Sequence, residues 1–518
     1  MAFSSTQYLA LSVLAGVWAS VYYRVRQRKR NPSRLPYPPG PKGIPILGNL
    51  LDLPREGYIY KAFRQWSRDF DSAIIHVQIL GTHIVVLNTK EVADDLLDNR
   101  SSIYSDRPRM PMMNELMGFA WSVGFTPYND WWKHSRRLFH QHFNPSAVER
   151  FRPKKLKATH AFLRRLADKP EDFRDHVRLM AGGVILDIAY GIDVQTADDP
   201  YLQRADEALH IVDKAGNPGS WLVDVLPALK YIPEWLPGAG FKRQARAWRA
   251  FVDRFMAMPF DAVKENMQRG GVVPSFTSLA LRDVTAEDEA ARRYQEELIK
   301  GVGATTYLAG ADTTMSVIAT FFLAMTMYPE VQRRAQEELD QVVGKDRLPD
   351  FTDEPSLPYT TAVMKEVLRW QQVAPFAIPH CVMTDDVYNG YFIPAGSIVI
   401  GNSWAVLHDE NLFPDPFTFN PGRFLDPNIS QRALAAVDHA FGFGRRLCPG
   451  RFMAMSFAWI TMASTLATFA VEKARDADGK EIDPTGAFSP GIMGTPEDFP
   501  CIIKPRSREA EDLVRATA

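Results

Sequence analysis

Three kinds of hydrophobic pattern divide the chain. Residues 3–23 form one apolar run without a single charge. From about residue 58 onward, apolar positions recur mostly at helical spacing, as they do in 329–339. Short apolar runs at 74–80, 83–87 and 397–401 are instead typical of strands, and Gly81-Thr82 between the first two predicts a hairpin. The pattern predicts a mainly α-helical fold with a small β-rich region.

The apolar run at the N-terminus has the length and flanks of a membrane anchor. About 20 apolar residues are enough to cross a bilayer core. The residues that follow are basic, and the first acidic residue is Asp52. The basic cluster comprises Arg24, Arg26, Arg28, Lys29, Arg30 and Arg34. This flank predicts a single-pass anchor over 1–23 with the rest of the chain in the cytosol. The alternative is a cleaved signal peptide, which would need a basic start and a small-residue cleavage site.

The anchor is followed by a basic and proline-rich segment, 24–45. Five prolines within 35–45 exclude a helix and predict a stiff extended strap that fixes the body relative to the anchor. A plain linker is the alternative. We expect one domain over 46–505. The charged residues 506–518 are expected to form a loose C-terminal tail.

A long apolar stretch within 291–328 predicts a buried helix. Asp312 and Thr313 interrupt it, and a carboxylate would be costly in lipid, so a second membrane span is not expected. In A-G-A-D-T-T, residues 309–314, Gly310 would allow a local distortion that opens a pocket. The acid and the hydroxyl could supply protons to dioxygen. The alternative is a polar notch in a buried helix.

Composition and charge narrow the class of protein. The 518 residues carry a formal net charge of −1, so no bulk electrostatic argument indicates nucleic-acid binding. The 11 Trp and 31 Phe favour a large apolar interior. The cysteines, Cys381, Cys448 and Cys501, are too few for a disulfide framework. A reducing compartment, or chemistry at one thiol, is the natural interpretation.

One of these thiols lies in F-G-F-G-R-R-L-C-P-G, residues 441–450. Gly442 and Gly444 would let the backbone pass close beneath a flat ligand. After Cys448, Pro449 and Gly450 open an apolar helix whose N-terminus favours a thiolate. The alternative is a glycine-rich turn with an inert core cysteine.

This segment resembles the haem-binding loop of the cytochrome P-450 family, F-x-x-G-x-R-x-C-x-G. Phe441, Gly444, Arg446, Cys448 and Gly450 fill every fixed position. The resemblance implies the cytochrome P-450 fold with one buried haem b and Cys448 as the thiolate ligand of its iron.

Further family motifs follow in order over roughly residues 30–505. Asp312 and Thr313 lie in the segment that resembles the family's distal helix motif, so the resemblance gives both a catalytic role. Glu366 and Arg369 match the family's E-x-x-R pair, and Arg423 resembles the third member of its buried cluster. The same spacing recurs at Glu149/Arg152, Glu171/Arg174, Glu289/Arg292, Glu330/Arg333 and Glu472/Arg475, where surface pairs are expected.

Haem propionates require cations or hydrogen-bond donors. Trp132 and Arg136 resemble the family's W-x-x-x-R helix, where both contact propionates, and Arg446 fits the same role. His380 lies where the family places a propionate-binding His or Arg. A satisfied histidine at a strand end is the alternative for His380.

The resemblance implies a monooxygenase that inserts one atom of dioxygen into a lipophilic small molecule. Electrons would come from NADPH through a separate cytochrome reductase at the endoplasmic reticulum membrane. The amino-acid sequence of residues 128–144 and 402–409 is similar to that of fungal secondary-metabolism members of the family. Two rivals remain: an oxygen-independent haem-thiolate isomerase or dehydratase, and a non-enzymatic membrane haem-binding protein. Family position suggests a substrate pocket formed by Met113, Phe119, Trp121, Thr305, Leu308, Phe376, Ile378 and Met493.

Overall fold

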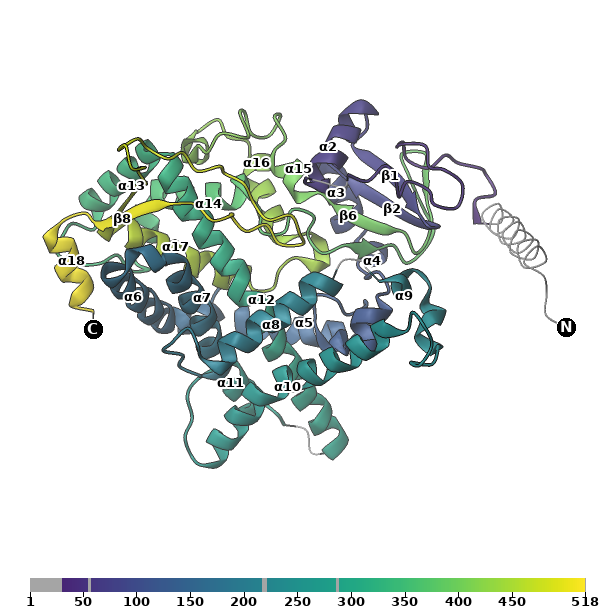
Figure 1. The fold of residues 1–518 in the computed structure, drawn as a ribbon, viewed down its shortest axis with the longest axis horizontal. Helices are drawn as coiled ribbons and strands as arrows, with labels where there is room; N and C mark the ends of the chain where they lie inside the picture. The colour runs from purple at the N-terminus through teal and green to yellow at the C-terminus, as the bar shows by residue number, and fades with distance from the viewer. Residues whose placement is uncertain (1–29, 55–56, 217–220, 286–287, 518) are drawn as a thin grey trace.

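Helices form most of the structure, a computed structural model that describes residues 30–54, 57–216, 221–285 and 288–517 (Figure 1). The helices are α2 Ile59–Asp69, α3 Lys90–Ala93, α4 Ser101–Tyr104, α5 Asp130–Phe143, α6 Arg152–Asp168, α7 Phe173–Tyr190, α8 Pro200–Ala215, α9 Leu222–Val225, α10 Gly240–Gln268, α11 Phe276–Arg282, α12 Glu289–Met327, α13 Pro329–Val342, α14 Pro358–Trp370, α15 Ser403–Leu407, α16 Gln431–Ala436, α17 Arg451–Thr468 and α18 Arg508–Arg515. The strands are β1 Ile74–Ile79, β2 Thr82–Leu87, β3 His380–Cys381, β4 Asp386–Tyr388, β5 Tyr391–Ile393, β6 Ile398–Gly401, β7 Phe469–Lys473 and β8 Cys501–Pro505. The mainly α-helical prediction is therefore confirmed.

Helix α12 organises the helical part. It packs most extensively against α7 and also contacts α5, α17, α10 and α11. Among the described helices it alone is long and apolar enough to cross a membrane, yet 67% of its apolar window is buried inside the fold. This burial agrees with the prediction of a core helix. The predicted anchor, 1–23, lies outside the described residues.

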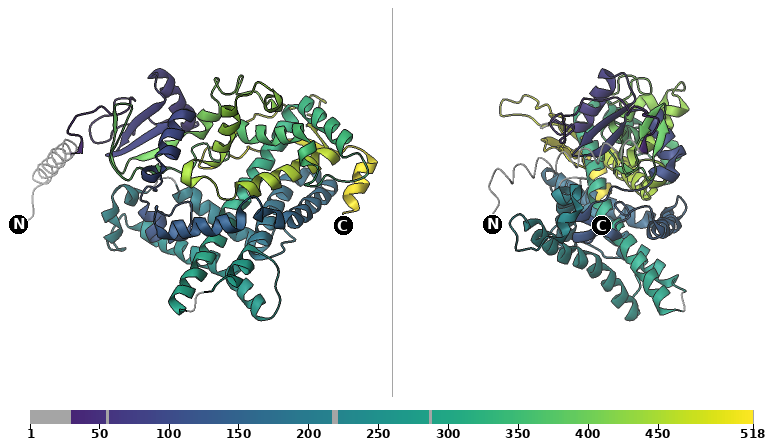
Figure 2. Two further views of the ribbon diagram at one scale, coloured as in Figure 1. Left: turned by 180° about the vertical axis from the view of Figure 1, so that it is seen from behind. Right: turned by 90° about the vertical axis from the view of Figure 1, so that its right-hand side faces the viewer.

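The principal sheet has four strands in the order β1-β2-β6-β3 and lies at the opposite end of the body from the C-terminus (Figures 1 and 2). β1 and β2 are antiparallel, β2 and β6 are parallel, and β3 is antiparallel to β6. All three strands expected from the apolar runs form. The hairpin turn is displaced by one residue: Ile79 pairs with Thr82, and Leu80 and Gly81 take φ values of 47° and 85°. Positive φ values at both central residues are what a type I′ hairpin turn requires.

The proline-rich segment packs against this β region. The backbone N–H of His76 donates to Pro39 O over 2.9 Å, and that of Phe392 donates to Pro36 O over 2.8 Å. Gly40 is needed for this approach, because a Cβ there would lie 2.1 Å from His76 O. At the start of the described residues, Arg30 forms an ion pair with Asp385. These contacts favour the strap over a plain linker.

The expected loose C-terminal tail is wrong for the described residues. Residues 508–515 form α18, which Ser507 caps by accepting a hydrogen bond from Ala510 N over 3.2 Å. Val514 is fully buried, and α18 packs against α6 and α17. Arg164 of α6 also donates to Thr517 O over 2.7 Å. Ala510 and Val514 lie one turn apart, and this apolar pair outweighs the charge that suggested a tail.

Candidate functional site: a cysteine beneath a cationic cavity

The loop that carries Cys448 is shaped by its own backbone. Cys448 N donates to Phe441 O over 2.9 Å and closes the loop. Gly442 and Gly444 take positive φ values of 96° and 51°. At Gly444 a Cβ would lie 1.9 Å from Leu97 O, so any larger residue would push the loop away from the body. The loop then delivers the thiol directly before α17, which begins at Arg451.

The Cys448 thiol has a different environment from the other two. Burial raises its pKa, while hydrogen bonds from the Gly450 and Arg451 backbone and the charges of Arg136 and Arg451 lower it. Burial raises the pKa of Cys381 and of Cys501 to about 12. Among these cysteines, only Cys448 lines the cavity described next. The structure therefore singles out one thiol as a candidate metal ligand.

A cavity of about 320 Å³ lies against the cysteine loop. Its wall combines segments far apart in sequence: α5, α7, α12, the stretch 368–380, and the loop that leads into α17. The predicted residues found in this wall are Trp132, Arg136, Thr313, His380, Phe441, Arg446, Cys448 and Gly450. Gly444 and Asp312 are not in the wall. Of the eight residues expected to form a substrate pocket, Thr305 and Ile378 line this cavity.

Two buried polar atoms in this wall lack partners. Asn129 caps α5 by accepting from Trp132 N over 2.9 Å, and α5 then carries Trp132 and Arg136 one turn apart. Arg446 lies over the Trp132 ring, with its Cζ 4.3 Å from the centroid. Within the described part of the chain, neither Trp132 Nε1 nor Arg446 Nη2 has a hydrogen-bond partner. Such buried donors indicate a missing acceptor.

Arg107 is a further cation in the wall that the sequence analysis missed. It is buried, donating from Nε to Gly124 O over 2.7 Å and from Nη1 to Ile378 O over 2.6 Å. Burial, and next Arg446, lower its pKa, but these carbonyls and Asp106 favour the charged form, so we take it as charged. Arg107 belongs to none of the motifs above; the only signal is a cation inside the proline- and methionine-rich run 107–113.

The wall carries an excess positive charge that matches a dianionic group. Arg107, Arg136 and Arg446 contribute three guanidinium charges. Burial lowers the pKa of Arg446 to about 9, which leaves it protonated at neutral pH. Among the described residues no Asp or Glu lines the cavity, and Asp106 nearby favours the charged forms of Arg107 and Arg446. The wall therefore holds more positive than negative charge. The two propionates of a haem have the complementary charge, so the residues present fit this cofactor.

His380 lies in the wall but in a neutral state. Its Nδ1 is 2.7 Å from Tyr104 O, and because a carbonyl only accepts, Nδ1 carries the proton. Burial, and then Arg107, hold its pKa well below the ordinary value. Nε2 is therefore an acceptor and could donate to a propionate only after gaining a proton. A propionate contact by His380 stays a prediction with that condition.

The two candidate catalytic residues of α12 differ in position. Thr313 lines the cavity, and its Oγ1 donates to Ala309 O over 2.6 Å. Asp312 lies outside the wall; burial raises its carboxyl pKa, while Arg178 lowers it. The expected distortion at Gly310 is wrong for this structure, since α12 is one continuous helix. Gly310 instead permits close packing on α7, because a Cβ would lie 2.7 Å from Ile185 Cδ1.

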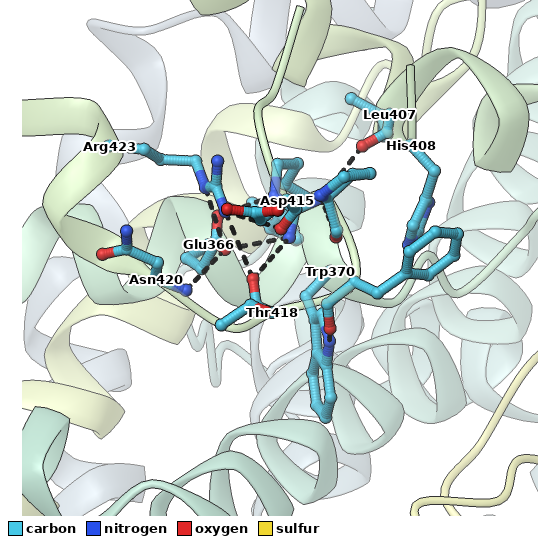
Figure 3. A network of polar contacts seen from close by, with 12 residues as sticks. Glu366, Trp370, Leu407, His408, Asp415, Thr418, Asn420 and Arg423 are labelled. Carbon is cyan, nitrogen blue, oxygen red and sulfur yellow. Dashed lines mark hydrogen bonds and ion pairs between the residues drawn. The ribbon is translucent and has the colours of Figure 1, made fainter. Parts of the chain in front are cut away.

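Beside the cysteine loop, Glu366 holds together the segment that precedes it (Figure 3). Arg369 donates to its two oxygens over 2.7 and 2.9 Å, and Arg423 donates over 3.2 Å. The backbone N–H of Asn420 adds a bond of 2.8 Å. Glu366 and Arg369 are fully buried. The three-residue cluster expected from the motif therefore forms.

The other E-x-x-R spacings behave differently from expectation. Glu149 and Arg152 form an exposed pair at 3.1 Å. Three of the remaining arginines pair with other carboxylates: Arg174 with Asp498, Arg292 with Glu296, and Arg475 with Glu481. The prediction of surface i,i+3 pairs is thus right for one of the five. Sequence spacing does not determine which acid an exposed arginine selects.

Comparisons with known proteins agree with this geometry. The family model described as Cytochrome P450 matches residues 38–498. Cytochrome P450 monooxygenase 98 of Postia placenta is 44% identical, covering 97% of this chain and 96% of the relative. Cytochrome P450 monooxygenase ple1 of Rhodocybe pseudopiperita is 42% identical, covering 100% and 98%. Tryptamine 4-monooxygenase of Psilocybe cyanescens is 41% identical, covering 96% and 97%.

Proposed function

The chain belongs to the cytochrome P450 family, and we propose that it inserts one atom of dioxygen into a lipophilic secondary metabolite, using electrons that a separate reductase takes from NADPH. Family membership makes it an oxygen-incorporating oxidoreductase with a haem-iron cofactor ligated by a cysteine thiolate. The substrate class, the electron donor and the residue roles below are the proposal.

One observation carries the proposal: a single cavity wall holds the Cys448 thiol, unpartnered donors on Trp132 and Arg446, and the Thr313 hydroxyl. Haem, when bound, supplies the chemistry of dioxygen activation, and the protein supplies binding, orientation and protons. Cys448 is the proposed iron ligand. Phe441, Gly444 and Gly450 shape the loop that holds it.

Trp132, Arg136 and Arg446 are the proposed propionate-binding residues, and the structure adds Arg107 to them. Their positive charge would be uncompensated without a dianion, and burial makes each unpaired guanidinium costly. Propionates at these donors would satisfy Trp132 Nε1 and Arg446 Nη2 together.

Thr313 and Asp312 are the proposed proton-handling pair. The Thr313 hydroxyl donates to Ala309 O, so its oxygen can still accept a hydrogen bond from a group in the cavity that Thr313 lines. Asp312 directly precedes Thr313 on α12 but lies outside the wall. Burial raises the pKa of its carboxyl, so it keeps its proton to a higher pH than an ordinary carboxyl does. Positioned proton transfer contributes about 10²- to 10⁴-fold to a rate.

The test compares wild-type protein with Thr313→Ala in the presence of NADPH, a microsomal reductase and ¹⁸O₂. A ligand that shifts the haem spectrum serves as substrate. Wild type should place ¹⁸O in the product; Thr313→Ala should still consume NADPH but form less product and more hydrogen peroxide per NADPH. Product formation without ¹⁸O, or turnover without NADPH, would favour the isomerase or dehydratase. No turnover under any condition would favour the haem-binding protein.

The last part of the proposal concerns how the protein lies at the membrane. Residues 24–518 are proposed to lie in the cytosol, anchored by 1–23 in the endoplasmic reticulum membrane. Asn428-Ile-Ser430 is a glycosylation sequon in which Asn428 is exposed. The topology requires Asn428 to stay unmodified in cells. Glycan on Asn428 would place the body in the lumen and overturn the proposal.

A further inference from the structure

One histidine at the start of the cysteine loop belongs to none of the motifs that the proposed function uses. His439 lies in the short 3₁₀ helix Val437–Phe441, which leads into the loop, and its side chain is 12% exposed. Its carbonyl oxygen accepts from Ser403 Oγ over 2.8 Å and from Gly442 N over 3.2 Å. These two bonds tie the backbone of His439 to α15 and to the loop itself.

The imidazole ring of His439 packs on a residue of the cavity wall. It stacks on the Phe443 ring, with centroids 4.7 Å apart and planes inclined by 30°. Phe443 lines the cavity and is buried. It also packs closely on Gly401, where a Cβ would lie 2.2 Å from Phe443 Cε2. Because the packing is close, a displacement of His439 is passed on to Phe443 and to the loop that carries it.

The same imidazole approaches a carboxylate. His439 Nε2 is 3.1 Å from Asp94 Oδ1 and has no hydrogen bond of good geometry among the described residues, so the attraction is that of an ion pair. Asp94 also forms an ion pair with Lys90. Burial acts to raise the pKa of Asp94, but His439 and Lys90 outweigh burial and leave this pKa below its ordinary value. Asp94 is therefore ionised at neutral pH and attracts the imidazole when it carries a proton.

Asp94 belongs to an element that also touches the loop at a second point. It is the first residue of the π-helix Asp94–Asn99. At Gly444 a Cβ would lie 1.9 Å from Leu97 O of this π-helix, and the two segments pack together. The π-helix thus contacts the chain on both sides of Phe443, through an ion pair at His439 and through close backbone packing at Gly444.

Resting on the proposed role of Cys448 as iron ligand, we propose that His439 is a positioning residue for that ligand. In its protonated form it links Asp94 to Phe443 and so holds the cysteine loop where the thiol can reach the iron. A cation over an aromatic ring is attracted by the electrons of its face, so the Phe443 ring adds to the attraction of the carboxylate. A neutral ring in place of His439 would keep the packing and lose both attractions.

The test measures how quickly the haem-loaded, full-length protein loses thiolate ligation. The reduced carbon monoxide complex is held in a fixed, non-denaturing concentration of urea. Its conversion from the thiolate-haem spectrum to that of haem without the thiolate is timed, and the bound haem is recorded alongside. His439→Phe keeps a stacked ring without charge, and Asp94→Asn keeps the shape of the side chain without charge. Each should speed the conversion by roughly five- to thirtyfold while haem stays bound.

Further variants show whether the two residues act as a pair. The double variant of His439→Phe and Asp94→Asn should convert no faster than the quicker single variant, because both changes remove the same attraction. Asp94→Glu keeps the carboxylate and should convert more slowly than Asp94→Asn. If His439→Phe does not take up haem, this last comparison still decides. Single variants that convert at the wild-type rate, or effects that multiply in the double variant, would overturn the inference.

A matched control and a second measurement separate positioning from general destabilisation. Glu91→Gln removes an exposed ion pair with Arg432 close to Asp94, and should convert at the wild-type rate. Unfolding in urea followed by far-ultraviolet circular dichroism reports the whole fold, and its midpoint should change little in His439→Phe. Faster conversion that only follows a lowered midpoint would make His439 a packing residue and overturn its role.

Failure of this inference can be told apart from failure of the proposed function. A wild-type preparation that binds haem without the thiolate-haem spectrum contradicts the proposed ligation by Cys448 itself. A wild type that shows the spectrum, with His439 and Asp94 variants that convert at its rate, contradicts only the positioning role of His439.

Discussion

The charged groups beside the cysteine loop and those of the region formed by 109–117 and 221–239, which we call the Glu115 region, differ in burial. Glu366 is fully buried and accepts four hydrogen bonds from Arg369, Arg423 and the Asn420 backbone. The Glu115 region combines buried apolar residues, among them Met112, Met113 and Val223, with ion pairs at its surface. There Glu115 pairs with Arg109 at 2.8 Å and with Lys230 at 2.5 Å.

Exposure separates the same two regions. The Glu115 region presents large apolar side chains to solvent: Leu222, Leu226, Tyr231 and Trp235 are 61%, 53%, 78% and 79% exposed. Breaking a buried, hydrogen-bonded ion pair costs several kcal/mol, whereas exposed pairs contribute about 0–1 kcal/mol. The comparison teaches that the buried charges beside the cysteine loop contribute strongly to stability, whereas the exposed ion pairs of the Glu115 region contribute little.

The largest effect is expected on the buried side. Glu366→Gln leaves the Arg369 guanidinium buried without its carboxylate partner, and should lower the free energy of unfolding by about 3–5 kcal/mol. Chemical denaturation followed by the haem absorbance measures it. Glu149→Gln is the matched control, because the exposed Glu149–Arg152 pair has the same spacing and should change stability by less than about 1 kcal/mol. Equal losses in the two variants would erase the contrast.

The next effect concerns how tightly the protein holds its haem. Arg446→Gln should speed transfer of haem to an excess of apomyoglobin by about ten- to a hundredfold, since a charge-assisted hydrogen bond contributes about 1.5–3 kcal/mol. Arg445→Gln is the control: it is the neighbouring arginine, is exposed, and lies outside the cavity wall. Haem loss from Arg446→Gln at the wild-type rate would remove Arg446 from propionate binding.

A smaller, pH-dependent effect on stability is expected at Asp224 in the Glu115 region. Burial raises its pKa to about 6. The native state therefore binds a proton more tightly than the unfolded state, and stability falls as pH rises from about 4 to about 6. Asp224→Asn should lack this contribution, on the order of 1 kcal/mol after solvent screening. Thermal midpoints of both proteins between pH 4.5 and 7 test it; a difference that stays constant with pH would contradict the buried carboxyl.

The smallest stability change is expected at the exposed ion pairs of Glu115. Glu115→Gln removes the pairs with Arg109 and Lys230, yet should lower stability by less than about 1 kcal/mol. Chemical denaturation followed by the haem absorbance measures the loss. A loss as large as that of Glu366→Gln would contradict the difference between buried and exposed ion pairs.

Sequence motifs predicted the residues whose role depends on local geometry. Cys448, Arg446 and Trp132 all lie in the cavity wall because a short loop and one capped helix place them there. The apolar runs likewise predicted β1, β2 and β6.

What the sequence could not supply depends on contacts between distant elements. Arg107 becomes a cavity cation only because Gly124 and Ile378 offer carbonyls to it. Asp312 lies outside the wall because adjacent helical residues point about 100° apart. Gly310 serves packing against Ile185, which no local pattern encodes. Helix α18 forms where the charged residues 506–518 suggested a loose tail, because it packs against α6 and α17.

The measurement that tests the account most directly is the reduced carbon monoxide spectrum of three single variants, Cys448→Ser, Cys381→Ser and Cys501→Ser. The account predicts that Cys448→Ser loses the thiolate-haem spectrum. Cys381→Ser and Cys501→Ser should keep it, since neither thiol lines the cavity. Retention of the thiolate spectrum by Cys448→Ser, or its loss in either of the other variants while haem stays bound, would contradict the central claim.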